Sequence, residues 1–529
     1  MGICGWNRRD VWSIFGTFKN AMHAGTERLT KMGLMEGWGR VKKGSAAPSL
    51  DGFPREVWEG LLSAGRMVVV SVGGAGDVAP LAWARAVSQR ASMGHVFAVG
   101  AWFGGVGQMD DRWADAVASS PWADWVTPVR AGVFAGSGWL RRAGVRAGVL
   151  SLSGKLTAAE LHALLRQYEG ILEDNAVICG DSAGLTDEVK AVLEGFGKVH
   201  RMVLAVHRTA PVWVLSAVPG KRVRKRELPE AASALVCLAH FYREKPAAGQ
   251  VRYGSHGLTP KASRLGAVSR WVGALAGLFG RSSALLHQSQ ARAVPVYGSG
   301  AMDLQIGLVM RRDANLWAEL GHLHAYLTPV VTDAPPMEVG FAAHRFGGMN
   351  VGQFDWYGFM EDDLEVVDPL FFRKMDWFVK EAGPDAVLFP QRVEAGPVAG
   401  VSRLFVDGAV RTQVTARFQD TGDRPVLMFR GMGSSFFFQR PTNPHCGAHF
   451  LKAEQLAKWL KDPEFGVAKA DFIGPLESAA TLGVMKNFRI YKPGVENPDF
   501  LEVRHAGNAY FSLLGGRIPL GFSDERAVP

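Results

Sequence analysis

The fold class is decided by residues 66–103, which read RMVVVSVGGAGDVAPLAWARAVSQRASMGHVFAVGAWF. The β-branched apolar run at 66–72 predicts a buried strand that ends in the glycine loop at 73–77. The helical period of 81–92 and the apolar run at 95–103 then predict a helix and a second strand. Strand, loop, helix and strand make a βαβ unit, which implies a parallel sheet and an α/β protein.

Helix and strand patterns go on alternating along the chain and predict two successive α/β domains. A chain of 529 residues is also too long for one ordinary core. We expect a basic, Trp-containing helical segment at 1–60, a Rossmann-like α/β accessory domain at 61–208, a second Rossmann-like α/β domain with a mixed sheet at 209–515, and a tail at 516–529.

The composition is that of a globular protein, with 47% hydrophobic and 21% charged residues. It excludes a fibre, a disordered chain and a disulfide scaffold. Four cysteines lie far apart with no CxxC spacing, which favours a reducing compartment. The first residues lack the apolar core of a secretory signal, and no apolar run is long enough to cross a membrane. We therefore predict a cytoplasmic protein.

The net charge of +9 is concentrated in basic segments. Arginine and lysine alternate with Trp, Phe and Leu in residues 1–45 and 261–283, a mixture that suits the anionic face of a membrane. Peripheral contact with the inner face of the membrane is one interpretation of these segments, and a polyanionic acceptor is another. Solvated helix faces are the third interpretation, and nucleic acid is not expected as a partner.

Three consecutive acids end an aromatic strand in FDWYGFMEDDLEVVDPLFF, residues 354–372. Glu361, Asp362 and Asp363 repel one another, so their position after a buried strand needs a compensating cation. The carboxyl end of a strand is also the ligand-binding edge of an α/β sheet, where carboxylates can hold Mg²⁺ or Mn²⁺ with a diphosphate. The alternative is an acidic loop that caps the helix beginning near Asp368.

Several segments, taken together, resemble the GT-A nucleotide-diphospho-sugar glycosyltransferases, in particular a bacterial, family-2-like subgroup. The resemblance covers about residues 210–515 and implies that the second domain has the GT-A fold. It also implies that the acidic triplet is a DxD-type motif, in which Asp363 with Glu361 approaches the metal, and Asp362 and Asp363 approach the donor. His505 would complete the metal site, or it is a satisfied histidine beside a strand end. The segments are YGFMEDDLEV, DPLFFRKMDWF, LFPQRVE, TNPHCGAHFLKAEQLAKW, IGPLESAATLGVMKNFRIYKP and FLEVRH.

An inverting transferase needs a carboxylate that deprotonates the acceptor hydroxyl. Glu477 follows a Gly-Pro turn and opens a helix of small residues, so its carboxylate can face a cleft from a helix N-terminus. Asp471 is the reserve candidate. Glu477 could instead only cap its helix, and a retaining enzyme would need no such base.

Two further segments are candidates for ligand contacts. His344 and Arg345 precede the acidic strand, where a cation could meet a phosphate or a carboxylated sugar. The loop with Gly73, Gly76, Asp77, Val78 and Pro80 is similar to the start of GT-B glycosyltransferases, although a structural glycine turn explains it as well.

The sequence thus predicts a metal-dependent, hexosyltransferase-type enzyme, with Mn²⁺ or Mg²⁺ as cofactor. A nucleotide-diphosphate sugar would be the donor and a glycan or lipid-linked molecule the acceptor, with inversion expected. The alternatives are a nucleotidyltransferase or nucleotide-sugar hydrolase with the same fold, or a non-enzymatic protein that binds polyanions or membranes.

Overall fold

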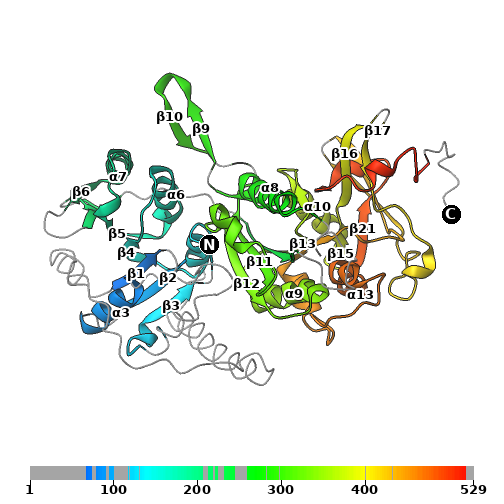
Figure 1. Cartoon of the computed structure of the whole chain (residues 1–529), viewed down its shortest axis with the longest axis horizontal. Coiled ribbons are helices and arrows are strands. Elements are labelled where there is room, and N and C mark those ends of the chain that lie inside the picture. The colour runs from blue at the N-terminus through cyan, green and yellow to red at the C-terminus, as the bar shows by residue number, and fades with distance from the viewer. Residues whose placement is uncertain are drawn as a thin grey trace, which may run out of the picture. The chain divides into compact units, whose positions relative to one another are not determined.

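The computed structural model describes residues 67–519, apart from internal gaps (Figure 1). All of the described residues belong to one unit of the chain, Pro48–Pro529. The gaps are residues 74–78, 91–93, 101–116, 118–119, 130, 207–211, 219–220, 224–231, 245–258, 282, 297, 299, 399–400 and 432.

Seven strands build the first sheet in the order β3-β2-β1-β4-β5-β7-β6. Neighbouring strands are parallel, except that β7 runs antiparallel to both β5 and β6. The chain moves from β1 to β3 on one side and returns at β4 on the other, so the topological switch point lies between β1 and β4. The strands are β1 (Met67–Val72), β2 (Gly94–Val99), β3 (Val126–Val129), β4 (Ala147–Leu152), β5 (Leu172–Asp181), β6 (Met202–Val206) and β7 (Val212–Ala217).

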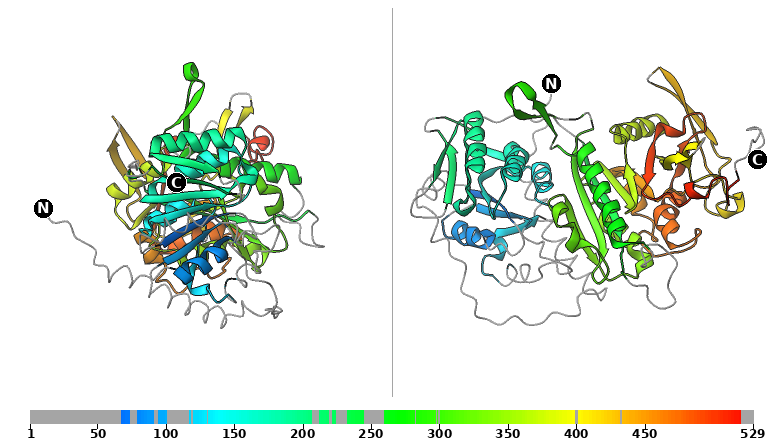
Figure 2. Two further views of the ribbon diagram at one scale, coloured as in Figure 1. Left: turned by 90° about the vertical axis from the view of Figure 1, so that its left-hand side faces the viewer. Right: turned by 45° about the horizontal axis from the view of Figure 1, so that its top comes forward.

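Helices cover both faces of the first sheet, as expected for βαβ connections. The helix α3 (Ala79–Arg90) packs Leu81 and Trp83 into one core cluster. The helices α5 (Gly136–Arg142), α6 (Ala158–Tyr168) and α7 (Asp187–His200) pack into the other cluster (Figure 2). Thr157 caps the N-terminus of α6, and its hydroxyl accepts the backbone N–H of Glu160 in a capping box.

Five strands build the second sheet in the order β12-β11-β8-β13-β20. The first four are parallel, and β20 is antiparallel to β13. The helices α8 (Lys261–Phe279) and α9 (Val339–Met349) bury Trp271 and Phe346 in the core of this sheet. The strands are β8 (Ser233–His240), β11 (Asp303–Arg311), β12 (Leu327–Thr332), β13 (Trp356–Glu361) and β20 (Ala448–Lys452).

Smaller sheets and short helices complete the described chain. One sheet has the order β14-β22-β16-β17, another the order β15-β21-β19-β18, and β9 pairs only with β10. The strands are β9 (Ala284–His287), β10 (Arg292–Pro295), β14 (Leu364–Val366), β15 (Ala386–Leu388), β16 (Gln391–Val398), β17 (Val401–Phe405), β18 (Val426–Gly431), β19 (Ser434–Gln439), β21 (Arg489–Pro493) and β22 (Glu502–His505). The helices are α10 (Phe371–Ala382), α11 (Ala453–Trp459), α12 (Pro475–Glu477) and α13 (Gly483–Asn487), with a π-helix at Ser478–Leu482.

The predicted class, α/β with two successive sheets, is confirmed. The first sheet continues to Ala217, beyond the expected boundary at residue 208, because β7 inserts between β5 and β6. Among the described helices, none combines the length and the apolar character that spanning a membrane requires.

The first prediction concerns the packing of the second sheet. A Cβ at Gly358 of β13 would lie 2.7 Å from the ring of Phe450 in β20, so Gly358→Ala must displace a buried ring. We expect its free energy of unfolding to fall by about 1–3 kcal/mol in urea titration. The control is Gly347→Ala in α9, where a Cβ meets no described atom within 4 Å and stability should rise by about 0.5–1 kcal/mol. Equal effects of the two changes would contradict the packing described.

Candidate functional site

The three acids of the aromatic strand lie at the carboxyl edge of the second sheet. Glu361 is the last residue of β13, and Asp362 and Asp363 lead into β14. The neighbouring parallel strand β8 ends at His240 on the same edge. Open α/β sheets commonly bind ligands at this edge.

Asp362 faces inward and is only 2% exposed. His240 Nδ1 lies 2.5 Å from Asp362 Oδ2, while His240 Nε2 accepts the backbone N–H of Leu316 at 3.1 Å. Because Nε2 is an acceptor, Nδ1 carries the ring proton, and this N–H donates a hydrogen bond to Asp362. Arg264 of α8 donates to the other oxygen of Asp362. Two donors from separate elements therefore fix this carboxylate in place.

Asp363 is the acid with an unmet hydrogen-bonding oxygen. Arg264 Nη1 donates to Asp363 Oδ2 at 3.3 Å, and His505 Nε2 lies 3.9 Å from the same oxygen. In the described structure Asp363 Oδ1 is buried without a hydrogen-bond partner. Burial alone would raise the pKa of Asp363, but Arg264, then His505 and Arg392, outweigh it and lower the pKa. Asp363 therefore presents a charged, unpaired oxygen at neutral pH.

His505 is oriented by a buried carboxylate. His505 Nδ1 lies 2.8 Å from Glu394 Oε1, so Nδ1 donates to Glu394 and Nε2 is turned toward Asp363. Glu394 has no exposed surface, and its Oε2 accepts the backbone N–H of Phe511 at 2.7 Å. The interactions that run from Asp363 through His505 to Glu394 thus link β14, β22 and β16 at the site.

Glu361 differs from its neighbours because it has lost its charge. Burial raises the pKa of Glu361 to about 8; Asp363 and Glu477 add to the rise, and Arg392 opposes it. Gly447 has φ +70°, and a Cβ there would lie 2.8 Å from Glu361 Oε2, so glycine leaves room for this carboxyl. Glu477 Oε2, like Asp363 Oδ1, is buried with no hydrogen-bond partner in the described residues. The fold therefore brings Glu477 to the acids, although 116 residues separate it from Glu361.

A group of buried cations lies beside the acids. Arg392 Nη2 donates to Asp407 Oδ1 at 2.7 Å, and Lys492 Nζ donates to the carbonyl of His445 at 2.6 Å. Burial opposes the charge of Arg392, but Asp407 and Glu361 outweigh it and raise its pKa above the usual value. A neutral carboxyl, an ionised carboxylate and a fixed cation in one place can give and take protons.

Sequence reasoning missed five contributors to this cluster. His240 and Arg264 carry no local signal, because their partners lie 122, 98 and 99 residues away. Arg392 and Glu394 did have a signal, since charges at alternate positions of one strand share a face. Asp407 follows β17 and became visible only through its pairing with Arg392.

Three of the predicted site residues, Asp471, Arg345 and His344, contact groups other than the acids of β13. Asp471 is exposed, and its backbone carbonyl accepts Arg417. Arg345 is exposed and donates to the carbonyl of Gly466 at 2.6 Å. His344 is buried among aromatic rings, so the two adjacent residues do not form one anion-binding pair.

The predicted Mn²⁺ or Mg²⁺ cofactor is wrong. Within the part of the chain that the structure describes, no group of three or more His, Cys, Asp or Glu side chains is arranged to hold a metal ion. The cation that compensates the acids is the guanidinium of Arg264, which binds both Asp362 and Asp363.

The first sheet has its own carboxyl edge at the switch point. Gly73 N–H donates to the carbonyl of Val99 at 3.1 Å, and Ser153 N–H donates to that of Val72 at 2.9 Å. Gly100 has φ +77°, and a Cβ there would lie 2.6 Å from the carbonyl oxygen of Gly73. The ends of β1, β2 and β4 are therefore joined closely by backbone alone.

Only part of the glycine loop and of the basic segments lies among the described residues. Pro80 lies in α3, whereas Gly76, Asp77 and Val78 and residues 1–45 lie outside the described residues. Residues 261–279 form α8, which buries Trp271 and Leu275 in the core and gives Arg264 to the acids. The apolar face expected to meet a membrane therefore packs against the sheet.

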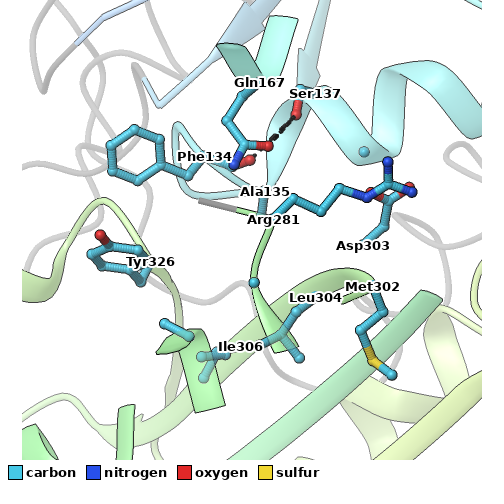
Figure 3. A pocket seen from close by; sticks show the side chains of 13 residues that line it. Phe134, Ala135, Ser137, Gln167, Arg281, Met302, Asp303, Leu304, Ile306 and Tyr326 are labelled. Atoms are coloured by element: carbon cyan, nitrogen blue, oxygen red, sulfur yellow. Dashed lines mark hydrogen bonds and ion pairs between the residues drawn. The ribbon is translucent and has the colours of Figure 1, made fainter. Parts of the chain in front are cut away.

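A pocket is also found between α5, the end of α8 and the beginning of β11 (Figure 3). Arg141 Nη1 and Arg281 Nε lie 3.1 and 3.0 Å from Asp303 Oδ1. Ser137 donates to Gln167 on the opposite side of the pocket. These contacts pair the charges there, so we assign no chemistry to this pocket.

The comparisons with known proteins found methyltransferases. No protein-family model and no curated protein matches the chain. One matching solved structure is a putative rRNA methylase from Clostridium thermocellum, with 14% identity, 31% of this chain and 89% of that chain covered, and a TM-score of 0.23. Others are a putative O-methyltransferase from Klebsiella pneumoniae (14% identity, 34% and 83% covered, TM-score 0.25) and an O-methyltransferase from Bacillus cereus in complex with SAH (11%, 35% and 84%, 0.24). Likeness at TM-scores of this size carries no argument about the activity of this chain.

The predicted resemblance to GT-A glycosyltransferases is not supported, and the matching structures named above are methyltransferases. The prediction of hexosyl transfer from a nucleotide-diphosphate sugar to a glycan or lipid-linked acceptor is withdrawn with it. The predicted membrane contact through residues 261–283 is corrected with it, because the apolar face of α8 packs against the second sheet.

The second prediction tests Arg264 as the internal counter-charge. Arg264→Gln leaves two buried carboxylates without their shared guanidinium, so we expect the free energy of unfolding to fall by about 3–5 kcal/mol. The control is Arg270→Gln on the exposed side of the same helix, with an expected change within about 0.5 kcal/mol. Urea titration of both variants measures the difference, and similar losses in the two would refute the assignment.

The third prediction follows from the protonated state of Glu361. Its pKa is raised in the folded protein from 4.5 to about 8, so its stabilising effect is complete below pH 4.5 and is lost as the pH rises toward 8. Glu361→Gln keeps a neutral side chain at every pH. We expect the unfolding free energy of the wild type, relative to this variant, to fall steadily between pH 5 and pH 8. A difference that stays constant over this range would show that Glu361 is ionised in the folded protein.

Proposed function

We propose that the first sheet binds S-adenosylmethionine and that the protein is a methyltransferase. The observation that carries this proposal is the strand order β3-β2-β1-β4-β5-β7-β6, in which only β7 is reversed. S-adenosylmethionine-dependent methyltransferases share a sheet of this order and direction. The proposal rests on this topology. It does not extend to the methyl acceptor, because fold alone leaves the substrate open.

The backbone at the switch point supports binding of a nucleoside there. In open α/β sheets the ligand lies outside the carboxyl ends of the strands, next to the point where the strand order reverses. Gly73 and Gly100 bring two strand ends together without side chains, so a ligand can approach the backbone. Gly154 follows β4 with φ +94°, and a Cβ at this position would meet no described atom within 4 Å.

One feature departs from the usual nucleoside site. Sheets that bind nucleosides commonly carry an acid about 20 residues after the glycine loop, and it binds the ribose hydroxyls. Here β2 ends at Val99, and Gly100, Ala101 and Trp102 follow. The ribose contact would therefore come from another segment, and we expect the affinity to depend mainly on backbone contacts.

S-adenosylmethionine, when bound, supplies a methyl group on a positively charged sulfur. The acceptor atom forms the new bond to the methyl carbon as the carbon–sulfur bond breaks, and neutral S-adenosylhomocysteine is the product. An acceptor that carries a proton must lose it. The role of the chain at the first sheet would be to bind the nucleoside and to hold the methyl carbon in line with the acceptor.

The buried cluster of the second sheet is included in the proposal as a proton-transfer site. Asp363 or Glu477 would accept the proton that the acceptor loses, because each keeps a buried oxygen without a partner. His505 would position Asp363. The cytoplasmic location predicted from the cysteines also belongs here, and the buried free thiols Cys179, Cys237 and Cys446 support it.

The fourth prediction tests nucleoside binding directly. We expect isothermal titration calorimetry to give saturable binding of S-adenosylhomocysteine and S-adenosylmethionine to the wild type, and much weaker binding of NAD. Gly154→Leu places bulk at the carboxyl end of β4 and should weaken binding at least about tenfold, which corresponds to 1.4 kcal/mol.

The control for this experiment is Gly144→Leu, which carries the same change at the amino end of β4. Gly144 also has positive φ (+69°) and meets no described atom within 4 Å, so both variants bear similar backbone strain. Equal affinity of the two variants, or no binding by folded wild type at millimolar ligand, would refute the proposal.

A further inference from the structure

The strand β18 forms an open edge of its sheet. The sheet has the order β15-β21-β19-β18, so β18 pairs with β19 on one side and with no described strand on the other. An unpaired strand edge presents a row of backbone N–H and C=O groups that can pair with a further strand. The direction of these groups and the side chains beside them determine what this edge can accept.

The pairing with β19 determines which backbone groups point outward. Arg440 N–H donates to the carbonyl of Pro425 at 2.8 Å, so these two residues form a hydrogen-bonded pair that continues the register of the hairpin. Hydrogen-bonded and non-hydrogen-bonded pairs alternate along an antiparallel ladder, so Met428 and the opposite residue Phe437 form a non-hydrogen-bonded pair. The backbone of Phe437 agrees with this alternation, because its carbonyl accepts the N–H of Gly494, next to β21, at 2.8 Å.

Three residues of β18 therefore direct their backbone N–H and C=O groups to the open edge, namely Val426, Met428 and Arg430. Among the described residues, no hydrogen bond joins these groups to another element. Their side chains are also exposed, Val426 to 57% and Met428 to 50%. A partner strand can thus reach both the backbone and the side chains of the same three residues.

The opposite face of the hairpin holds β18 in place. The ring of Phe429 packs against the rings of Trp377 and Phe378 in α10, with both centroid distances 5.9 Å. Leu427 packs against the same hydrophobic core. The edge is therefore fixed before any partner arrives, and binding would need little ordering of this chain.

The charge of the hairpin favours one kind of partner. Residues 424–440 contain three arginines, Arg424, Arg430 and Arg440, and no acid. Arg440 is buried and hydrogen-bonded, whereas Arg430 is exposed and has no ion-pair partner in the part of the chain that the structure describes. The hairpin of a second copy would bring the same positive charges to this edge, which is unfavourable, whereas an acidic strand would be attracted.

We propose that β18 is a docking edge for an extended segment of another protein, in which acidic and apolar side chains share one face. The segment adds to the sheet as a further strand, and its backbone pairs with the outward groups of Val426, Met428 and Arg430. An acidic side chain lies opposite Arg430, and apolar side chains lie opposite the other two residues. This edge lies on other elements than the proposed S-adenosylmethionine site and does not depend on that function.

The fifth prediction uses a fluorescently labelled synthetic peptide, Thr-Glu-Thr-Val-Thr-Val-Thr, as the probe. In antiparallel pairing its glutamate faces Arg430, and its valines face Met428 and Val426. Fluorescence anisotropy with the full chain should show saturable binding. Replacement of the glutamate by lysine should weaken binding roughly three- to tenfold, because a like charge then lies opposite Arg430.

Met428→Pro separates backbone pairing from side-chain contact. It removes an N–H that points to the open edge and leaves the hydrogen bonds to β19 in place. We expect a thermal midpoint close to that of the wild type and peptide binding at least about tenfold weaker, because the proline ring also obstructs the added strand. The matched control is Met428→Ala, which keeps the N–H and should weaken binding less than about threefold. Arg430→Glu should reverse the preference, so that the lysine peptide binds better than the glutamate peptide.

Hydrogen exchange followed by mass spectrometry gives a second measurement that does not need the proline variant. Saturating peptide should slow exchange within residues 426–430 of the wild type, because their outward N–H groups become paired. Unchanged exchange there would overturn the proposal, as would the absence of saturable binding to folded wild type or equal affinity of Met428→Pro and Met428→Ala. Self-association of the wild type that Met428→Pro abolishes would assign the edge to a second copy and overturn the choice of partner.

Discussion

The guanidinium of Arg264 is the charge on which the second sheet depends. Three acids follow one another where a buried strand ends, and each would lose its hydration there. Arg264 reaches two of them, Asp362 and Asp363, from a helix that lies almost 100 residues earlier in the chain. At Glu361, burial and the nearby carboxylates of Asp363 and Glu477 outweigh Arg392, and Glu361 accordingly takes up a proton. The packing of α8 against the sheet and the protonated carboxyl of Glu361 thus both reduce the negative charge that is buried at the end of β13.

The sequence was informative wherever the signal was local. Apolar β-branched runs predicted the strands. The acidic run after a buried strand led to Glu361, and a Gly-Pro turn at the start of a helix led to Glu477, and these two residues do interact. The counter-charge could not be predicted, because an acidic triplet at a strand end looks the same whether a metal or an arginine compensates it. Arg264 lies among basic and apolar residues that also fit a surface helix, and only tertiary packing distinguishes the two.

The first sheet shows another limit of local patterns. A strand, a glycine loop and a helix predict a parallel α/β sheet, but no local feature distinguishes β7 from a further parallel strand. Its insertion between β5 and β6 is a long-range event that depends on the whole sheet. The topology that supports a methyltransferase is therefore visible only in three dimensions, whereas the motifs that suggested glycosyl transfer were all local.

The π-helix between α12 and α13 connects two close contacts of the second domain: Glu477 lies near Glu361, and a Cβ at Gly483 would lie 2.2 Å from Trp459 Cζ2. It holds one more residue per turn than an α-helix would, with Glu477 directly before it and Gly483 directly after it. Each residue of an α-helix turns the chain by about 100°. Deletion of one residue at Ser478–Leu482 would restore regular winding and rotate Glu477 away from Glu361, or Gly483 away from Trp459. Evolution can therefore shorten this segment only by giving up one of these two contacts, so its length in homologous chains should change together with the residues at both ends.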